Sequence, residues 1–351
     1  MRPMNSGGWT IESADLRNAS DEVFAALYVL EEAFQIEAKP DEPPTPFEAF
    51  RAQYRSMPSY RESRAWIAYE GGEPIATVTA DFDRTGDNDH VIEAFATVLP
   101  AHRKRGLART LLAPVVEAGE TDGRTLFMGY SYSPVPSGAA FLQRLGAEEG
   151  LVERESELDL VGLDRALIDQ WVAEGPKRAA AYELVVIEDD LPEEYLEAFA
   201  ALYAVSNSAP RDALDIADTH RTPEQIREKD TKRHESGSER ILCLARHRAS
   251  GDLAGWTELG RHPSEPEKVQ QFWTAVHPDH RGSALGKWLK ATTIVRSFER
   301  WPEAKKIVTE NAYSNDAMLG INNQLGFAET AAWSVWQMPL AEVRRFVAEA
   351  D

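Results

Sequence analysis

Arg103-Lys-Arg-Gly-Leu-Ala108 and Arg281-Gly-Ser-Ala-Leu-Gly286 are two copies of one short segment, 178 positions apart in the chain. Each copy follows an extended run that ends in proline, at Pro100 and Pro278, and each leads into an apolar helical stretch. A turn of small residues between a strand and a helix leaves several backbone N–H groups pointing to one place, where the helix dipole also favours negative charge. Such turns bind phosphate or pyrophosphate. The duplicated segment therefore predicts a phosphate site in each half of the chain.

The sequence around the two segments repeats as well. Each half has, in order, a helix, two strands joined by a Gly-containing turn, a third strand, the phosphate segment with its helix, a strand, a helix and a final strand. The expected strands are 64–69, 74–80, 91–98, 124–130 and 157–161 in the first half, and 241–246, 253–259, 269–276, 306–310 and 334–338 in the second. This order predicts an α+β fold in which each half builds a mixed, mostly antiparallel sheet flanked by helices. We expect domains at 1–163 and 181–351, with a connecting helix within 164–180 and the boundary near Gly175.

Composition limits the classes of partner. The 351 residues are enough for two domains with proper cores. The net charge of −20 argues against nucleic acid and anionic membranes as partners, and is compatible with a cationic substrate such as an amine. The single cysteine, Cys243, excludes an intramolecular disulfide and a multi-cysteine zinc site, and its strand-like surroundings predict a buried core thiol. The single cysteine and the lack of a long apolar run or an apolar leader lead us to expect a cytoplasmic protein. We expect it to be a monomer or a homodimer.

With these motifs the chain resembles the GNAT superfamily of acyl-CoA-dependent N-acetyltransferases, fused in tandem as in the mycothiol-synthase-like acetyltransferases. The family's loop reads Arg/Gln-x-x-Gly-x-Gly/Ala, and Arg103, Gly106 and Ala108 fill it completely. In the second copy Ala284 stands where the first glycine is expected. Each copy also carries the family's later Leu-Gly signature, at 145–147 and 325–327.

The resemblance implies an enzyme that moves an acetyl group from acetyl-CoA to a primary amine of a small molecule, by direct attack in a ternary complex and without a metal. A P-loop is not a competing interpretation, because three residues rather than four separate Gly282 from Gly286 and Trp288 replaces the Ser/Thr that binds Mg²⁺. The CoA-binding residues implied in the first copy are Val98, Arg103, Arg105, Gly106, Ala108 and Arg109. Those in the second are Val276, Arg281, Gly282, Ser283, Ala284, Gly286, Lys287, Asn311 and Asn315.

The catalytic groups are less complete. The resemblance puts a glutamate base on the strand before the loop, which predicts Glu93 in the first copy. Gln270 or Gln271 stands there in the second, so Glu258 on the adjacent strand is its candidate. The tyrosine that protonates the leaving thiolate is expected where Leu142 and Asn322 stand.

Tyr313 is the substitute we select for that acid, with Tyr130 and Tyr132 as others, unless the thiolate leaves unassisted or through water. The second copy is slightly favoured as the catalytic one because Asn311 and Asn315 should edge the acceptor channel. Two alternatives stay open. The protein could be a non-catalytic acyl-CoA-binding sensor, or one copy could be catalytic and the other structural.

Overall fold

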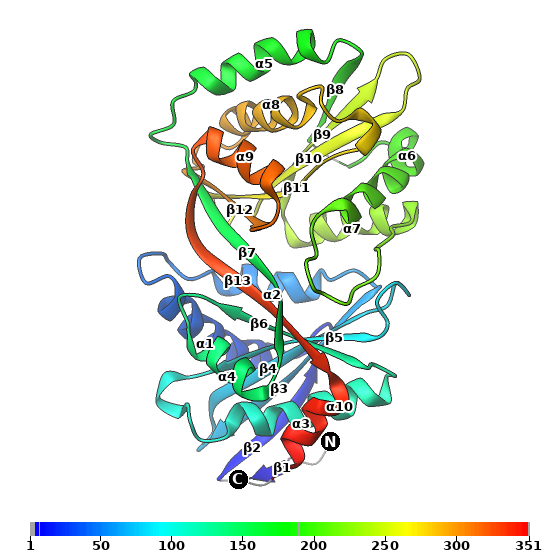
Figure 1. Cartoon of the computed structure of the whole chain (residues 1–351). Coiled ribbons are helices and arrows are strands. Elements are labelled where there is room, and N and C mark those ends of the chain that lie inside the picture. Colours follow the sequence, from blue (N-terminus) through cyan, green and yellow to red (C-terminus); the bar gives the residue numbers. More distant parts are fainter. Residues whose placement is uncertain (1–3, 7, 189, 350–351) are drawn as a thin grey trace. The chain divides into compact units, whose positions relative to one another are not determined.

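The computed structural model describes residues 4–6, 8–188 and 190–349 and separates into two compact units. Unit 1 consists of Met1–Val152, Arg211–Ala217 and Ala332–Asp351, and unit 2 of Glu153–Pro210 and Asp218–Ala331. Both units combine a sheet with helices on its two faces (Figure 1). Within the described part of the chain, every helix is too short or too polar to cross a membrane.

The sheet of unit 1 has the strand order β1-β2-β3-β4-β5-β6-β13. All neighbouring strands in it are antiparallel except β5 and β6, which are parallel. The strands are β1 (Met4–Ser6), β2 (Trp9–Asp15), β3 (Arg61–Glu70), β4 (Glu73–Asp83), β5 (Val91–Val98), β6 (Leu126–Tyr132) and β13 (Ala328–Pro339).

Alternation along β3 explains how the unit 1 sheet is covered. Ala65 and Ile67 pack under helices α1 (Asp21–Ala38) and α2 (Phe47–Arg55) on one face. Trp66 and Ala68 point to the other face and join the core made with α3 (Leu107–Thr121), α4 (Ser137–Leu145) and α10 (Leu340–Ala348). A strand buried on both faces reads as the continuous apolar run seen here. The short helix η1 (Pro100–His102) links β5 to the loop before α3.

Unit 2 repeats this plan with the strand order β7-β12-β11-β10-β9-β8. Its parallel pair is β11 and β12. The strands are β7 (Glu148–Asp159), β8 (Tyr182–Ile187), β9 (Glu239–His247), β10 (Leu253–Arg261), β11 (Lys268–Val276) and β12 (Lys306–Ala312). The helices are α5 (Ala166–Arg178), α6 (Glu193–Tyr203), η2 (Ala204–Ser208), α7 (Pro223–Ser236), η3 (Pro278–His280), α8 (Leu285–Arg300) and α9 (Asp316–Leu325).

Along β9, Leu242 and Leu244 pack with α6, while Ile241 and Cys243 belong to the cores under α8. The predicted buried thiol is confirmed, since Cys243 has no exposed surface and burial raises its pKa.

The predicted α+β fold class, with a mixed and mostly antiparallel sheet in each unit, is confirmed. The units are not contiguous segments, however. Strand β13 from the end of the chain pairs with β6 in unit 1, and β7 pairs with β12 in unit 2. The two final strands are thus exchanged relative to the boundaries 1–163 and 181–351. The alternation of apolar and polar residues shows which face of a strand is buried, but not which of two similar sheet edges the strand joins. The exchange could therefore not be predicted from the sequence.

The expected connecting helix is present as α5, which runs through Gly175 and Pro176 to Arg178. Gly175 marks a close helix contact rather than a boundary: a Cβ added there would lie 2.3 Å from Cγ of Trp288 on α8.

Candidate functional site

The candidate site of unit 1 begins where the parallel strands β5 and β6 separate. Their pairing runs from Val91↔Leu126 to Ala94↔Gly129 and stops there, although β5 continues to Val98 and β6 to Tyr132. On its other edge β5 stays paired with β4 up to Ala76↔Val98. Within the described part of the chain, the last four residues of β5 therefore have no strand partner on one backbone edge.

The backbone groups on this open edge follow from alternation. The N–H of Leu99 donates to the carbonyl of Ile75 at 3.1 Å, so Leu99 faces β4. Because successive residues present their N–H and C=O groups to opposite edges of a strand, Val98 and Ala96 face the open edge. The carbonyl of Val98 accepts a bond from Nε of Arg103 at 3.0 Å. This leaves the N–H of Val98 and both backbone groups of Ala96 directed toward the gap.

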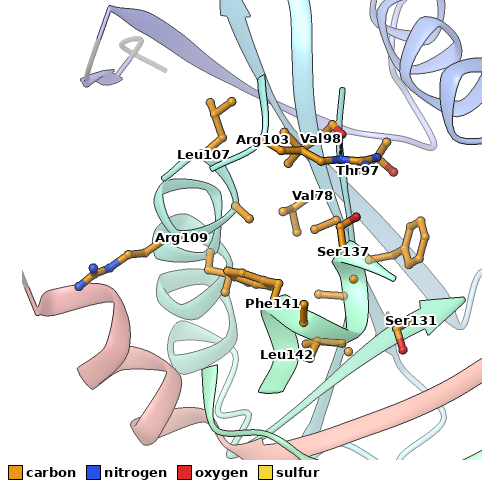
Figure 2. Close-up of a pocket in the computed structure, with 18 of the residues that line it drawn as sticks. Val78, Thr97, Val98, Arg103, Leu107, Arg109, Ser131, Ser137, Phe141 and Leu142 are labelled. Carbon is orange, nitrogen blue, oxygen red and sulfur yellow. Dashed lines mark hydrogen bonds between the residues drawn. The ribbon is translucent and has the colours of Figure 1, made fainter. Parts of the chain in front are cut away.

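A cavity of about 570 Å³ fills the gap between the strands (Figure 2). It extends from the loop 103–106 and the first turn of α3, past Phe95–Val98, to Tyr130–Tyr132 on β6. Its walls are mostly apolar and include Val78, Leu112, Phe127, Phe141, Leu142 and Phe346. Ligand pockets of this kind are lined by apolar side chains with a few placed polar groups.

Both loops have the same backbone form. In the first, Lys104 and Gly106 have φ angles of 61° and 83°, and in the second, Gly282 and Ala284 have φ angles of 85° and 59°. In each loop two left-handed residues, two positions apart, turn the chain so that Leu107 and Leu285 begin α3 and α8. The backbone N–H groups of the loop and first helical turn thereby lie at a helix N-terminus, the position at which the sequence predicts a phosphate site. Gly106 in the first loop and Ala284 in the second thus both adopt a left-handed conformation, and the two loops have the same shape.

The arginines that begin the two loops bind other protein atoms, and Arg103 also lines the cavity. Arg103 forms a two-pronged ion pair with Glu37 on α1 in addition to its bond to Val98. Arg281 makes the equivalent bond to its own strand: its Nε lies 3.0 Å from the carbonyl oxygen of Val276. It also donates a hydrogen bond to Ser208. Both arginines therefore close the turn between strand and loop.

The other predicted loop cations point in different directions. Arg105 pairs with Glu70 at 2.5 Å. Arg109 lies over the ring of Phe346 and points away from the cavity in Figure 2. In unit 2, Nζ of Lys287 bonds Gln324 at 2.9 Å. These three side chains thus contact other protein groups.

Glu93 and Tyr130 come together beside the cavity. The hydroxyl of Tyr130 donates to Oε2 of Glu93 at 2.6 Å, and a guanidinium nitrogen of Arg61 lies 3.9 Å from the same oxygen. Burial, followed by the charge of Glu93 and the hydrogen bond to it, raises the pKa of Tyr130 well above its usual value. Tyr130 thus keeps its proton and holds the Glu93 carboxylate in place. The predicted base Glu93 is therefore hydrogen-bonded to Tyr130, one of the three tyrosines considered as the acid.

In unit 2, the predicted catalytic residues Glu258 and Tyr313 are bound to different partners. Glu258 is 7% exposed on β10 and lies 3.5 Å from Nζ of Lys229 on α7. Burial would raise its pKa, but Lys229 and Arg240 outweigh burial and hold the pKa below its usual value. Tyr313 is 43% exposed in the loop after β12 and donates to Glu329 at 2.5 Å.

Strand β11 of unit 2 contains a bulge that β5 lacks. Thr257 pairs with Thr274, and Leu259 pairs with Gln271. Between these two pairs the chain advances three residues along β11 but two along β10. The displaced carbonyl of Glu258 accepts a bond from the side-chain amide of Gln271 at 2.8 Å. A buried side chain thus stabilises the bulge, as expected for a bulge that is a regular part of the fold.

The two predicted asparagines lie at the start of α9 and on the strand before it. Oδ1 of Asn315 accepts from the N–H of Met318 at 3.2 Å and caps α9. Oδ1 of Asn311 accepts from Nδ2 of Asn322 at 2.7 Å. Asn322 therefore takes a hydrogen-bonding role at a position where the resemblance predicted a tyrosine.

Sequence reasoning missed the apolar walls of the unit 1 cavity. Phe34 on α1, Phe141 on α4 and Phe346 on α10 line it, although they are distant from the loop in sequence. Helical periodicity marks each as part of a buried face, but periodicity does not distinguish a core contact from a cavity wall.

Comparison with known proteins finds a family and solved structures that this chain resembles. The sequence model of the Acetyltransferase (GNAT) family matches residues 25–146. A solved tandem GNAT protein from the clavulanic acid biosynthesis pathway is 25% identical, covers 97% of this chain and 100% of its own, and superposes with a TM-score of 0.76. A GCN5-related N-acetyltransferase from Sphaerobacter thermophilus is 14% identical, with 94% and 96% of the chains covered and a TM-score of 0.67. No curated protein matches this sequence. The first half of the chain therefore contains a GNAT acetyltransferase domain, and the chain as a whole has the fold of a tandem GNAT protein.

Proposed function

We propose that the protein is an acetyl-CoA-dependent N-acetyltransferase that acetylates a primary amine of a small molecule by direct attack in a ternary complex. The observation that carries this proposal is the cavity of unit 1, which joins the anion-binding loop to the open backbone edge of β5. A CoA thioester has the matching parts, with a diphosphate at one end and an amide-bearing arm that leads to the acyl group.

Backbone groups of unit 1 would hold the donor. The loop N–H groups and the positive end of α3 would bind the diphosphate. Ala96 and the N–H of Val98 would pair with the amide-bearing arm as a strand would. A backbone N–H aimed at the thioester carbonyl also stabilises the negative charge that develops there during attack.

Glu93 would accept the proton from the attacking amine, directly or through a water molecule. One of its oxygens is held by Tyr130, which fixes the carboxylate and leaves the other oxygen for the substrate. A carboxylate in reach of the amine also favours the binding of a cationic acceptor. Tyr130 itself is a poor acid for the leaving thiolate, because its pKa is raised far above the ~8.5 of a thiol.

Unit 1, rather than unit 2, is favoured as the site of this reaction. The unit 1 cavity is open along β5 and Glu93 lies beside it. In unit 2 the corresponding candidate, Glu258, is already neutralised by Lys229 at 3.5 Å. An incoming ammonium group would have to displace that lysine.

Two measurements test the proposal. Calorimetry of the protein with CoA and with acetyl-CoA should show binding, and Ala108→Trp should weaken the binding in unit 1 at least tenfold by covering the first turn of α3. Thiol release from acetyl-CoA should then identify an amine acceptor from a panel of small amines. If neither CoA nor acetyl-CoA produces heat at millimolar concentration, the proposed function is wrong.

One observation favours a second candidate, a non-catalytic acyl-CoA-binding protein. Leu142 lines the cavity where the resemblance predicts the tyrosine acid, and it cannot donate a proton. A sensor would bind acetyl-CoA in calorimetry but release no thiol with any acceptor in the panel. Turnover with one amine rejects this candidate.

A further inference from the structure

The interior of unit 2 contains a lysine that forms no ion pair with a carboxylate among the described residues. Lys290 on α8 is 1% exposed, and the contacts of the described residues give its Nζ one hydrogen-bond acceptor, Oδ1 of Asn322 at 2.6 Å. The ring of Phe327 lies 5.3 Å from the same nitrogen. Burying an ammonium group with so few partners is costly, and replacement by an apolar side chain is often neutral or stabilising. A buried cation of this kind is therefore a candidate functional group.

A chain of hydrogen bonds connects Lys290 to strand β12. Because an ammonium group can only donate, Asn322 must turn Oδ1 toward Lys290 and Nδ2 toward Asn311. Nδ2 of Asn322 accordingly donates to Oδ1 of Asn311 at 2.7 Å. Asn311 belongs to the end of β12, beyond Val308, where the ladder with β11 stops.

The repeat shows what lies at these positions in unit 1. Lys290 and Leu112 are each five residues after the first residue of their helix, and Asn322 and Leu142 each precede the glycine that ends theirs by four. Asn311 and Ser131 are each five residues after the start of their strand. Leu112, Ser131 and Leu142 all line the unit 1 cavity. Two leucines and a serine of the unit 1 wall are thus replaced in unit 2 by a cation and two amides.

We propose that unit 2 is a second acyl-transfer centre in which Lys290 is the general acid for the leaving thiolate. Attack of an amine on the thioester carbonyl breaks the C–S bond and leaves the electron pair on sulfur. Lys290 transfers one Nζ proton to that sulfur, which produces CoA as a free thiol and a neutral lysine. The proton lost by the attacking amine goes to solvent, and solvent later reprotonates Lys290, so atoms and charge balance. The inference rests on the proposed use of acyl-CoA but concerns the other unit.

Burial supports this role as well, since it lowers the pKa of Lys290 to about 7. An acid with that pKa gives up its proton readily to a thiolate, whose conjugate thiol has a pKa of ~8.5. No charged side chain contributes to the shift, which has burial as its cause.

The test uses CoA itself as the probe in full-length protein. Ala108→Trp blocks unit 1, and its matched variant Gly286→Trp alters the same position of the second loop. Thiolate formation of CoA bound to the Ala108→Trp protein is followed by ultraviolet absorbance against pH. The apparent thiol pKa should be at least about one pH unit below that of free CoA, because an ammonium group lies beside the sulfur. Adding Lys290→Met should restore the free value, while the CoA dissociation constant at about pH 6, where the thiol is protonated, changes less than threefold. Lys290→Arg should keep the lowered value.

The outcomes separate this inference from the proposed function. If the Ala108→Trp protein does not bind CoA but the wild type does, only the second centre is rejected. An apparent thiol pKa that is equal with and without Lys290→Met also rejects it and makes Lys290 structural. If the wild type does not bind CoA either, both proposals fail. Melting of the Lys290→Met protein at or above the wild-type temperature verifies that the variant is folded.

Discussion

Arg103 donates from Nε to the carbonyl oxygen of Val98 at 3.0 Å, and thereby ties the loop back to the end of the strand that leads into it. Arg281 and Val276 make the same bond at the same distance in unit 2. The resemblance makes the loop arginine a CoA-binding residue. In this structure its bond to the strand carbonyl sets the direction in which the loop N–H groups point.

This bond gives a direct prediction for CoA binding. Arg103→Lys removes the planar fork that contacts Val98 and Glu37 together, because an ammonium group cannot reproduce both contacts. We expect the dissociation constant for CoA in unit 1 to rise roughly tenfold, about 1.4 kcal/mol. The matched variant Arg281→Lys should leave unit 1 binding unchanged. Calorimetry in the Gly286→Trp background, which isolates unit 1, measures both. Equal affinities for wild type and Arg103→Lys would mean that the loop keeps its form without the fork.

The sequence was sufficient to predict those parts of the fold that depend on local pattern. The two loops, the strand-to-helix order and the buried Cys243 all follow from short segments and their periodicity. The shape of the second loop also tolerates Ala284, whose φ of 59° matches the left-handed angle of Gly106. The backbone conformation at this loop position is thus left-handed in both copies, although the residue type differs.

The remaining features depend on contacts between residues distant in sequence. The exchange of β7 and β13 reflects a choice between two similar edges, which alternation cannot specify. The ion pair between Arg103 and Glu37 joins residues 66 positions apart. Lys290 looks in sequence like an ordinary polar residue of a surface helix, and its complete burial is apparent once α8 and α9 are packed.

Glu93→Gln tests the assignment of the base. The amide keeps the shape of the side chain but cannot accept the amine proton, so we expect kcat to fall by roughly 10² while acetyl-CoA binding is unchanged. Tyr130→Phe removes the hydrogen bond that positions the carboxylate and should lower kcat less, by roughly tenfold. Steady-state kinetics with the acceptor found in the amine panel checks both. Glu258→Gln is the control from unit 2. A larger loss in Glu258→Gln than in Glu93→Gln would place the reaction in unit 2.

The left-handed residues predict opposite stability changes in the two loops. Ala284→Gly relieves a φ of 59° and should raise the free energy of unfolding of unit 2 by roughly 0.5–1 kcal/mol. Gly106→Ala should lower that of unit 1 by roughly 1 kcal/mol through φ strain alone, because no atom lies within 4 Å of the added Cβ. Chemical denaturation of the two variants beside the wild type measures the changes. Shifts of the same sign in both would show that backbone strain does not control these positions.

Lys290 makes the stability of unit 2 depend on pH in a definite direction. Its pKa is about 7 in the folded protein and ~10.4 in the unfolded chain. Between these values the unfolded state binds more protons, so the free energy of unfolding rises with pH, by up to about 1.4 kcal/mol per pH unit. Below pH 7 both states are protonated, and the cost of burying the charge is constant and at its largest. From pH 7.5 to 9.0 the wild type should therefore gain about 1–2 kcal/mol more than Lys290→Met. Urea unfolding at the two pH values measures the difference, with the half-buried Lys287→Met on the same helix as the control. Parallel pH profiles for wild type and Lys290→Met would show that the buried lysine is not titrating in this range.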